Sequence, residues 1–348
     1  MTSLYVISPA SFSGKSAICL GLVKKLIEAG FSVSYMKPIS TTARRVGGRI
    51  IDEDAEFMKQ TFELAESLKD MAPVLLDPIT VESILHEEGE DYAQRVKDAY
   101  ERVAKGKDVV ILEGAASLTE GSVVGLPAYR MAELLDAQEL VVSRYSSDLI
   151  VDELLAAREL LGESMIGAVI NAVPRMKQEF VEETMVPFLQ KRGIPVFAVL
   201  PQEKILLSIS VQELADHLDG RILCCPENAD ELVENLMVGA MSVDSALTYF
   251  RRTANKAVIT GGDRPDIQLA ALETSTRCLV LTGNLQPSPI ILGRAEEVGV
   301  PIVLVRQDTL TAVEIIEQIF GKSRFHQAKK IHRFERLLNQ RFDFEALY

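Results

Sequence analysis

Short, continuous apolar runs alternate with amphipathic helical patterns along most of this chain. In its first part, the runs that predict strands are 4–7, 33–36, 109–112, 140–142, 166–170 and 196–200. The helical patterns between them are 18–27, 55–65, 92–104, 131–135, 149–161 and 180–191. Strands that are apolar on both faces and alternate with helices are typical of a parallel sheet covered by helices on both sides. The sequence therefore predicts an α/β fold.

The alternation restarts on a smaller scale after about residue 203. Strands are predicted at 221–225, 257–260, 279–282 and 302–305, and helices at 211–217, 229–241, 243–250, 266–273, 289–298 and 309–320. We therefore predict two α/β domains, at residues 1–201 and 202–322. The tail at 323–348 is locally basic and aromatic. We expect it to be helical and to pack on a domain or across a dimer, not to bind nucleic acid.

Composition and charge exclude several classes of protein. The net charge of −13 argues against broad nucleic-acid binding, which needs a basic face. No apolar run approaches the ~18 residues of a membrane span, and the N-terminus enters a strand without a signal-peptide pattern. The four cysteines have no CxxC spacing, and the four histidines have no zinc-binding pattern. We therefore expect buried thiols in a reducing cytoplasm.

The stretch SPASFSGKS, Ser8 to Ser16, joins the first predicted strand to the first predicted helix. A strand, a turn ending in Gly14-Lys15-Ser16 and a helix form the arrangement of a phosphate-binding loop. Backbone N–H groups of such a turn and helix end point at one spot. Lys15 adds a positive charge, and the Ser16 hydroxyl can hold Mg²⁺. The usual pattern has glycine where Pro9 stands, so the assignment depends on its context.

Polar side chains follow other predicted strands at their carboxyl ends, where open parallel sheets bind ligands. Lys37 follows the second strand, Glu113 the third and Asn171 the fifth. Lys37 could instead be a solvated loop lysine, and Glu113 could cap a helix. A buried carboxylate is costly unless it is paired, and Mg²⁺ is a suitable partner. We favour functional roles for Lys37 and Glu113. Asp52 and Asp54 could equally be an acidic first helical turn.

Polar loops also follow three strands of the second predicted domain. Their sequences are Gly261-Gly262-Asp263-Arg264, Gly283-Asn284-Leu285-Gln286 and Arg306-Gln307-Asp308. If these strands are parallel neighbours, the loops converge on one edge of the sheet. Both aspartates are good helix N-caps. We favour capping for Asp308, and a small-metabolite site formed by Gly261, Gly262, Asp263, Arg264 and Asn284. No nucleophile–base pair is visible, so this domain is expected to be a sensor or assembly module.

These motifs, taken in order, resemble a known family. SxSGKS, KP after the second strand, DEDA, EGA and NAVP resemble dethiobiotin synthetase. More closely, they resemble the N-terminal portion of long phosphotransacetylases and the BioD-like proteins related to it. KAVITGGDRPDIQLAALETS and CLVLTGNLQPSP resemble the DRTGG domain that follows in those proteins. The resemblance spans nearly the whole chain and implies a P-loop NTPase-type parallel sheet followed by a smaller α/β DRTGG domain.

The resemblance implies that ATP and Mg²⁺ are the cofactors. The residues it implies for ATP are Ser11, Ser13, Gly14, Lys15 and Ser16, with Asn171 reading the adenine edge. The residues it implies for Mg²⁺ are Ser16, Asp54 and Glu113. Lys15 and Lys37 take catalytic roles, and Lys37 would face the transferred phosphoryl group or the substrate. Family likeness also implies a homo-oligomer.

Departures from the family bear on function. The loop glycines of the synthetases are absent, and the loop at 41–48 differs from their substrate loop, so biotin synthesis is not implied. A phosphotransacetylase would need a further catalytic domain after the DRTGG domain. We therefore expect a nucleotide- or metabolite-responsive regulatory protein without acetyltransferase activity, with at most weak ATPase or ligase activity. The alternatives are an ATP-dependent ligase or carboxylase acting on a carboxylate or carbamate, and a non-catalytic scaffold with a degenerate loop.

Overall fold

A computed structural model describes residues 2–46, 49–86, 90–320, 325 and 327–347. The chain forms two compact units. The first comprises Met1–Gln202 together with Phe334–Tyr348, and the second comprises Glu203–Arg333. None of the described helices is long and apolar enough to cross a membrane.

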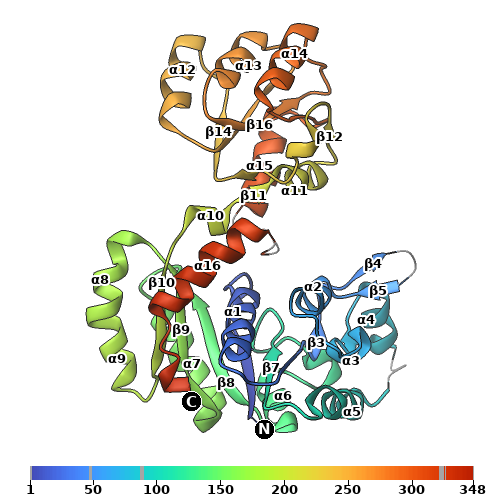
Figure 1. The fold of residues 1–348 in the computed structure, drawn as a ribbon, viewed down its shortest axis with the longest axis vertical. Helices are drawn as coiled ribbons and strands as arrows, with labels where there is room; N and C mark the ends of the chain where they lie inside the picture. Colours follow the sequence, from blue (N-terminus) through green and yellow to red (C-terminus); the bar gives the residue numbers. More distant parts are fainter. Residues whose placement is uncertain (1, 47–48, 87–89, 321–324, 326, 348) are drawn as a thin grey trace. The chain divides into compact units, whose positions relative to one another are not determined.

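A six-stranded parallel sheet forms the centre of the first unit (Figure 1). Its strands are β1 (Thr2–Ile7), β2 (Val33–Met36), β7 (Val109–Glu113), β8 (Gln138–Arg144), β9 (Met165–Val173) and β10 (Val196–Pro201). Their order is β10-β9-β8-β1-β7-β2. Because β1 lies between β7 and β8, the loop that follows β1 sits centrally at the carboxyl edge of the sheet. The predicted parallel α/β fold is confirmed.

Helices cover this sheet on both faces. The main helices of the first unit are α1 (Lys15–Glu28), α5 (Tyr92–Ala104), α6 (Ala128–Leu135), α7 (Ile150–Leu161), α8 (Gln178–Phe180) and α9 (Val186–Gln190), with a π-helical turn η4 (Val181–Met185) between the last two. One core cluster joins α5, α6, α7 and α9 to strand residues such as Tyr5 and Leu112. The alternate strand residues, such as Val6 and Ile111, are also buried. Since successive strand side chains point to opposite faces, neither face is exposed.

The C-terminal helix α16 (Ala328–Arg341) packs its second half against α1. A Cβ atom built at Gly21 would lie 2.2 Å from Cδ2 of Leu338, so the two helices approach closely at a glycine. Glu335 pairs with Lys24 at 2.8 Å on the same surface. Helix α1 is therefore covered by α16 as well as by the sheet. Residues 323, 324, 326 and 348 of the predicted tail lie outside the described residues.

Smaller elements join β2 to α5. They are β3 (Ile39–Ser40), β4 (Arg44–Val46), β5 (Arg49–Ile51), α2 (Glu53–Thr61), α3 (Leu68–Met71), β6 (Val74–Leu75) and α4 (Pro78–Leu85). β3 pairs in parallel with β6, and β4 pairs antiparallel with β5. No periodic pattern is visible in the sequence at 66–90, because elements this short do not repeat a period. The predicted loop at 41–48 is described only in part, since residues 47–48 lie outside the described ranges.

The second unit has its own five-stranded sheet, in the order β12-β17-β16-β15-β14. Its strands are β12 (Arg221–Ile222), β14 (Asn235–Val238), β15 (Lys256–Gly261), β16 (Thr276–Thr282) and β17 (Ile302–Leu304), and β11 (Ile209–Ser210) pairs separately with β13 (Leu232–Val233). Its helices are α10 (Lys204–Leu207), α11 (Val211–His217), α12 (Val243–Arg252), α13 (Pro265–Leu272), α14 (Pro289–Val298) and α15 (Thr309–Ile319). β14 to β17 are parallel, and β12 is antiparallel.

The helix predicted at 229–241 is wrong. Strands β13 and β14 occupy this segment, and β14 pairs in parallel with β15. The apolar spacing of the segment suits a helix as well as a strand. In the structure, Leu236 packs against one core cluster of the second unit and Met237 against the other. This alternation between faces is that of a strand, and pairing with β15 decides it.

Candidate functional site

The loop between β1 and α1 turns at Gly14. Gly14 is the N-cap of α1 with φ of 98°, and it offers no side-chain cap. The first N–H groups of the helix therefore remain available to an anionic ligand. Phe12 also has a left-handed backbone, with φ of 56°, although it is not a glycine. Ser8 stabilises the beginning of the loop, because its Oγ accepts from the N–H of Ala10 at 3.1 Å.

Lys15 is buried at the start of α1, with 8% of its surface exposed. Among the residues that the structure describes, its ammonium group has no hydrogen-bond or ion-pair partner. Burial lowers the pKa of Lys15, while the charge of Glu113 acts in the opposite direction. A buried ammonium group without a direct partner is costly. A bound anion would offset that cost, so the predicted phosphate-binding role fits the local structure.

Glu113 closes β7 and is 2% exposed. The hydroxyl of Ser16 donates to its Oε1 at 2.6 Å, and the hydroxyl of Tyr35 donates to its Oε2 at 2.7 Å. The pKa of Glu113 is raised, because burial and the charge of Asp54 outweigh the opposite effects of Lys37 and the two hydrogen bonds. Each oxygen of this carboxylate, at the carboxyl end of its strand, therefore accepts one hydrogen bond.

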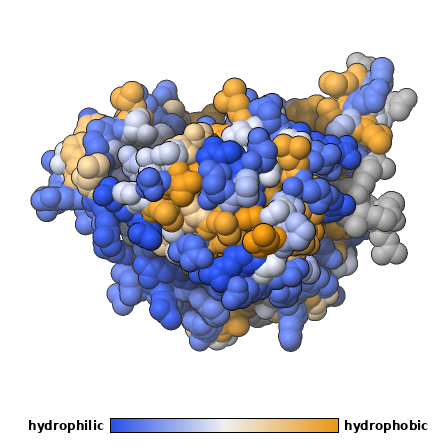
Figure 2. All heavy atoms as spheres, turned by 90° about the horizontal axis from the view of Figure 1, so that it is seen from above, coloured by the Kyte–Doolittle hydropathy of each residue, from blue (hydrophilic) through white to orange (hydrophobic). Residues whose placement is uncertain are grey.

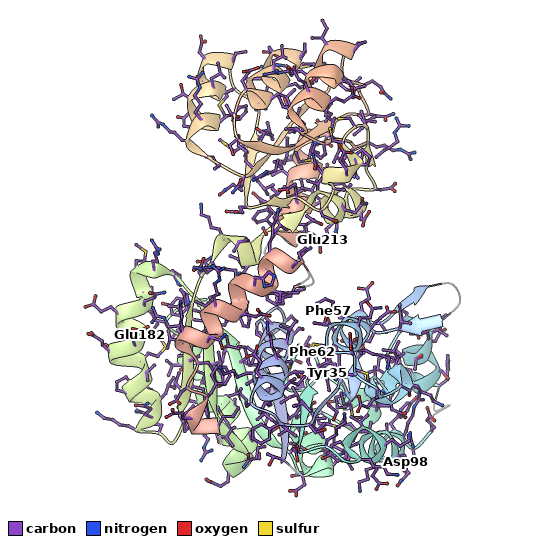
Figure 3. The ribbon with its side chains drawn as sticks, in the orientation of Figure 1. Tyr35, Phe57, Phe62, Asp98, Glu182 and Glu213 are labelled. Carbon is purple, nitrogen blue, oxygen red and sulfur yellow. The ribbon has the colours of Figure 1, made fainter. Side chains whose placement is uncertain are left out.

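Tyr35 is a site residue that the sequence analysis missed. It is fully buried on β2, which pairs directly with β7, and it lies inside the first unit (Figure 3). Its sequence signal is a hydroxyl group within a short, largely apolar strand next to the strand that ends in Glu113. Burial, followed by the charge of Glu113, raises the pKa of Tyr35 well above its ordinary value. The raised pKa favours the protonated hydroxyl that donates to Glu113.

Lys37 lies between two carboxylates after β2. Its Nζ is 3.0 Å from Oδ2 of Asp52 and 2.6 Å from Oδ2 of Asp54, and it also donates to Oγ1 of Thr42 at 3.3 Å. Burial opposes the charge of Lys37, but the nearby carboxylates outweigh burial and raise its pKa. In contrast to Lys15, the charge of Lys37 is already compensated.

Asp52 has a structural role as well. Its Oδ1 accepts from the N–H of Ala55 at 2.7 Å and caps α2, while Ser40 donates to its Oδ2 at 2.5 Å. The sequence left open that Asp52 belongs to an acidic helix start, and in the structure it is the N-cap of α2. Asp54 lies in the first turn of the same helix and reaches back to Lys37.

The predicted Mg²⁺ ligands are only partly assembled. The structure brings Ser16 and Glu113 together, while Asp54 pairs with Lys37. Among the described residues, no group of three or more His, Cys, Asp or Glu side chains could hold a metal ion. Hydroxyl and carboxylate oxygens nevertheless suit Mg²⁺, which commonly takes its remaining ligands from phosphate and water. The buried Oγ of Ser13 also has no hydrogen-bond partner. These residues fit Mg²⁺ together with a phosphate group.

Asn171 and Ser11 are the remaining residues predicted to bind the nucleotide. Asn171 lies near the end of β9, and its Nδ2 donates to the carbonyl of Ser13 at 2.8 Å. The structure therefore brings Asn171 to the phosphate loop. Ser11 is exposed on that loop.

The polar loops of the second unit do share one edge, because β15, β16 and β17 are parallel neighbours. At this edge, a Cβ atom at Gly262 would lie 2.0 Å from the carbonyl oxygen of Leu285, so the neighbouring loop accounts for this glycine. Asn284 is exposed and has φ of 55°. Asp308 caps α15 by accepting from the N–H of Thr311 at 3.0 Å, as favoured from the sequence.

In this loop cluster, Arg264 already has partners. Arg264 pairs with Asp266 at 3.0 Å and donates to the carbonyl of Met241 at 3.1 Å. Asp263 lies against Gly261, where a Cβ atom would be 2.3 Å from its Oδ1.

Large apolar side chains are exposed on the second unit, namely Tyr249, Leu269, Leu285, Ile290, Val298 and Leu310. Figure 2 shows apolar side chains among polar ones on the face that it draws.

Two family descriptions match this chain. Residues 2–209 match the AAA domain, and residues 213–319 match the DRTGG domain. A P-loop domain followed by a DRTGG domain is the architecture expected from the sequence motifs, and it is confirmed.

Curated proteins resemble the chain at low identity. Phosphate acetyltransferase of Nitratidesulfovibrio vulgaris is 24% identical over 99% of this chain and 51% of its own length. The ATP-dependent dethiobiotin synthetase BioD of Caldicellulosiruptor saccharolyticus is 28% identical over 34% of this chain and 49% of its own length. The chain thus spans about half the length of the curated phosphate acetyltransferase.

A solved structure also resembles part of the chain. It contains the CBS and DRTGG domains of the regulatory region of Clostridium perfringens pyrophosphatase, complexed with the activator diadenosine tetraphosphate. It is 18% identical, covers 40% of this chain and 69% of its own chain, and has a TM-score of 0.30. At that TM-score, the similarity supports no conclusion about a ligand here.

The function expected from the sequence requires correction. A regulatory protein without acetyltransferase activity was expected, with a ligase or a scaffold as alternatives. Relatives that match nearly the whole chain are instead named phosphate acetyltransferase, at 24% identity. No finding supports the absence of that activity. The expectation drew on a missing downstream domain, and where a sequence ends does not establish what a protein lacks.

Proposed function

The chain belongs to the AAA domain family, which matches residues 2–209, and from this membership we propose that it binds and hydrolyses ATP with Mg²⁺ at the phosphate loop. Lys15 carries the proposal. Its buried ammonium group has no direct partner among the described residues, beside a helix N-terminus that no side chain caps. An anion at this point would pair with Lys15 and accept hydrogen bonds from the helix N–H groups.

Ser16 and Glu113 are the proposed holders of Mg²⁺. The metal ion, when bound, would neutralise phosphate charge and polarise the terminal phosphoryl group. The Ser16–Glu113 hydrogen bond supports this role, because it keeps two suitable oxygens together. Tyr35 fixes the second oxygen of Glu113 and leaves the first to Ser16. ATP is the proposed nucleotide because of the likeness to an ATP-dependent synthetase.

Lys37 stays a proposed catalytic group. Two carboxylates hold its ammonium, so its charge would act on a phosphoryl group only after Asp54 is drawn to another cation. The side chain of Asp54 is 28% exposed, whereas that of Asp52 is fully buried. Asp54 is therefore the more movable partner. This supports its proposed role as a ligand that joins Mg²⁺ only when nucleotide is present.

Thermal-shift measurements test this function with ATP, ADP and GTP, each with and without Mg²⁺. We expect Mg²⁺-ATP to stabilise the wild-type protein and not the Lys15→Ala variant. Lys105→Ala removes an exposed lysine at the end of α5 and serves as the matched control. Release of inorganic phosphate from ATP then reports hydrolysis. Absence of any ATP-dependent shift in the wild-type protein would refute the proposal.

Acetyl transfer to phosphate is a second candidate function. It is favoured by the name of relatives that match 99% of the chain. The assay is formation of acetyl phosphate from inorganic phosphate and an acetyl thioester, using the full chain. Activity above a heat-denatured control would support this candidate, and absence of activity at high protein concentration would contradict it.

Three further predictions concern the setting of the protein. A small metabolite at the edge formed by the Gly261–Arg264 loop and Asn284 stays a prediction, as does a homo-oligomer. Light scattering of the full chain measures the oligomer directly. We also propose that the protein is cytoplasmic, and its four free, buried cysteines suit a reducing compartment.

A further inference from the structure

Glu120 lies on the loop that leads from β7 to the short 3₁₀ helix η1 (Ser122–Val124), and it is partly exposed. Its Oε2 accepts from the N–H of Ala116 at 2.5 Å, so the side chain folds back over its own loop. Among the residues that the structure describes, its Oε1 has no hydrogen-bond partner. The loop therefore holds one oxygen of this carboxylate, and the other remains available.

Close backbone contacts at both ends fix where this loop lies. The N–H of Gly114 donates to the carbonyl of Val6 at 2.8 Å, and a Cβ atom at Gly114 would lie 2.9 Å from Cγ2 of Ile7. The loop thus begins against the end of β1, directly before the phosphate loop. Near its other end, a Cβ atom at Gly121 would lie 2.8 Å from Cδ1 of Ile39.

These contacts place Glu120 between the phosphate loop and the segment that carries Lys37. Gly121 directly follows Glu120, and Ile39 follows Lys37 and a proline. Burial lowers the pKa of Lys15, and the charge of Glu120 is among those that oppose this effect. The carboxylate of Glu120 therefore acts on the ammonium group that is proposed to bind phosphate.

We propose that Glu120 is a catalytic residue of ATP hydrolysis, which binds the attacking water through Oε1 and accepts a proton from it. This inference rests on the proposed ATP hydrolysis at the phosphate loop. The water oxygen forms a bond to the γ-phosphorus while the bond between that phosphorus and the leaving oxygen of ADP breaks. The proton of the water passes to Glu120 and then to the solvent. P-loop enzymes commonly use one residue to orient the nucleophile in this way.

The other carboxylates near Lys15 are less suited to this role. Glu113 is the proposed holder of Mg²⁺, and both Asp52 and Asp54 pair with the ammonium group of Lys37. A nearby positive charge favours the ionised form of a carboxylate and makes it a weaker base. Among the described residues, Glu120 has no ion-pair partner.

Glu120→Gln separates catalysis from the support of the loop. The amide oxygen of glutamine can still accept from the N–H of Ala116, while its NH₂ group takes the place of the available oxygen and accepts no proton. We expect this variant to lower kcat roughly a hundredfold or more, without weakening ATP binding in calorimetry. An unchanged kcat would overturn the proposal. A loss of ATP affinity as large as the loss of kcat would also overturn it.

Binding of ADP with aluminium fluoride tests the same contact without turnover. In the presence of Mg²⁺ this pair resembles the transferring phosphoryl group with the attacking water in place, as a transition-state analogue. Aluminium fluoride is expected to tighten ADP binding to the wild-type protein at least roughly tenfold. Glu120→Gln is expected to lose most of that gain and to bind ADP alone as the wild-type protein does. An equal gain in both proteins would overturn the proposal.

Asp308→Asn is the matched control. It also converts a carboxylate that accepts from a backbone N–H into an amide, at the start of α15 in the second unit. We expect wild-type ATP affinity and phosphate release. If this variant lowered kcat as Glu120→Gln does, the loss would be general and the proposal would be overturned.

The wild-type protein distinguishes failure of this inference from failure of the proposed function. If it released no phosphate from ATP, the proposed hydrolysis would fail, and the role of Glu120 would fall with it. If it hydrolysed ATP and Glu120→Gln did so equally well, only the role of Glu120 would be overturned.

Discussion

Replacing Lys37 with methionine should destabilise the first unit by about 3 kcal/mol. The ammonium group lies 3.0 Å from Oδ2 of Asp52 and 2.6 Å from that of Asp54, and its side chain is 6% exposed. Removing one partner of a buried ion pair typically costs about 3–5 kcal/mol. We expect the lower end of this range. Asp54 is partly exposed, and Asp52 keeps its hydrogen bonds from Ser40 and from the N–H of Ala55.

Calorimetric melting measures this loss. For a unit of this size, 1 kcal/mol corresponds to roughly 2–4 °C, so Lys37→Met should lower the melting temperature by roughly 6–12 °C. The folded-state pKa of Lys37 is raised above its ordinary 10.5. Its contribution to stability is therefore fully present below pH 10.5 and lost only as the pH rises through the folded-state pKa. The drop in melting temperature caused by Lys37→Met should therefore be constant between about pH 6 and 9, where Lys37 stays charged.

A double-mutant cycle with Asp52→Asn is the measurement that could refute this reasoning. In the Lys37→Met background the carboxylate of Asp52 has lost its counter-ion, so Asp52→Asn should then destabilise much less than it does in the wild-type protein. We expect a coupling energy of about 2 kcal/mol, within the range for residues in one ion-pair network. If the two substitutions were additive to within about 0.5 kcal/mol, the charge compensation described for this cluster would be wrong.

Two other predictions concern stability alone. Gly21→Ala should destabilise by about 1–3 kcal/mol, because its methyl group meets Leu338 of α16, whereas Gly293→Ala should stabilise by about 0.5–1 kcal/mol, because nothing lies within 4 Å of its Cβ position in α14. Equal melting temperatures for these two variants would contradict the packing of α16 on α1. Glu139 is buried, its Oε1 has no hydrogen-bond partner, and burial raises its pKa from 4.5 to about 7. Its contribution to stability is thus fully present below pH 4.5 and lost as the pH rises through about 7, so wild-type stability should fall across that window relative to Glu139→Gln. Parallel pH profiles of melting temperature for the wild-type protein and Glu139→Gln would contradict this role of Glu139.

The sequence predicts the fold better than the contacts within the site. The strand at 109–112 is a continuous apolar run, and its doubly buried place in the sheet follows from that pattern. The segment at 229–241 has a spacing that suits both a helix and a strand, and only its pairing with β15 distinguishes them. Where short-range pattern and long-range pairing compete, the sequence alone does not show which prevails.

The same limit applies to the candidate site. Lys37 and Glu113 could be placed at strand ends, because a strand end is a local property of the sequence. That Tyr35 binds Glu113, or that Asp52 and Asp54 both reach Lys37, depends on contacts between separate elements. The sequence motifs assign the two lysines similar roles. The structure separates them, because Lys15 has no direct partner among the described residues, while Lys37 has two.

Calorimetric titration of the full chain with ATP, with and without Mg²⁺, tests the central claim most directly. The account predicts binding to the wild-type protein that Mg²⁺ strengthens. Glu113→Gln should lose the dependence on Mg²⁺, and Lys15→Ala should lose at least tenfold in affinity, which corresponds to about 1.4 kcal/mol or more. The Lys105→Ala control should bind as the wild-type protein does. Wild-type protein that binds no ATP, or a Lys15→Ala variant that binds it equally well, would contradict the account.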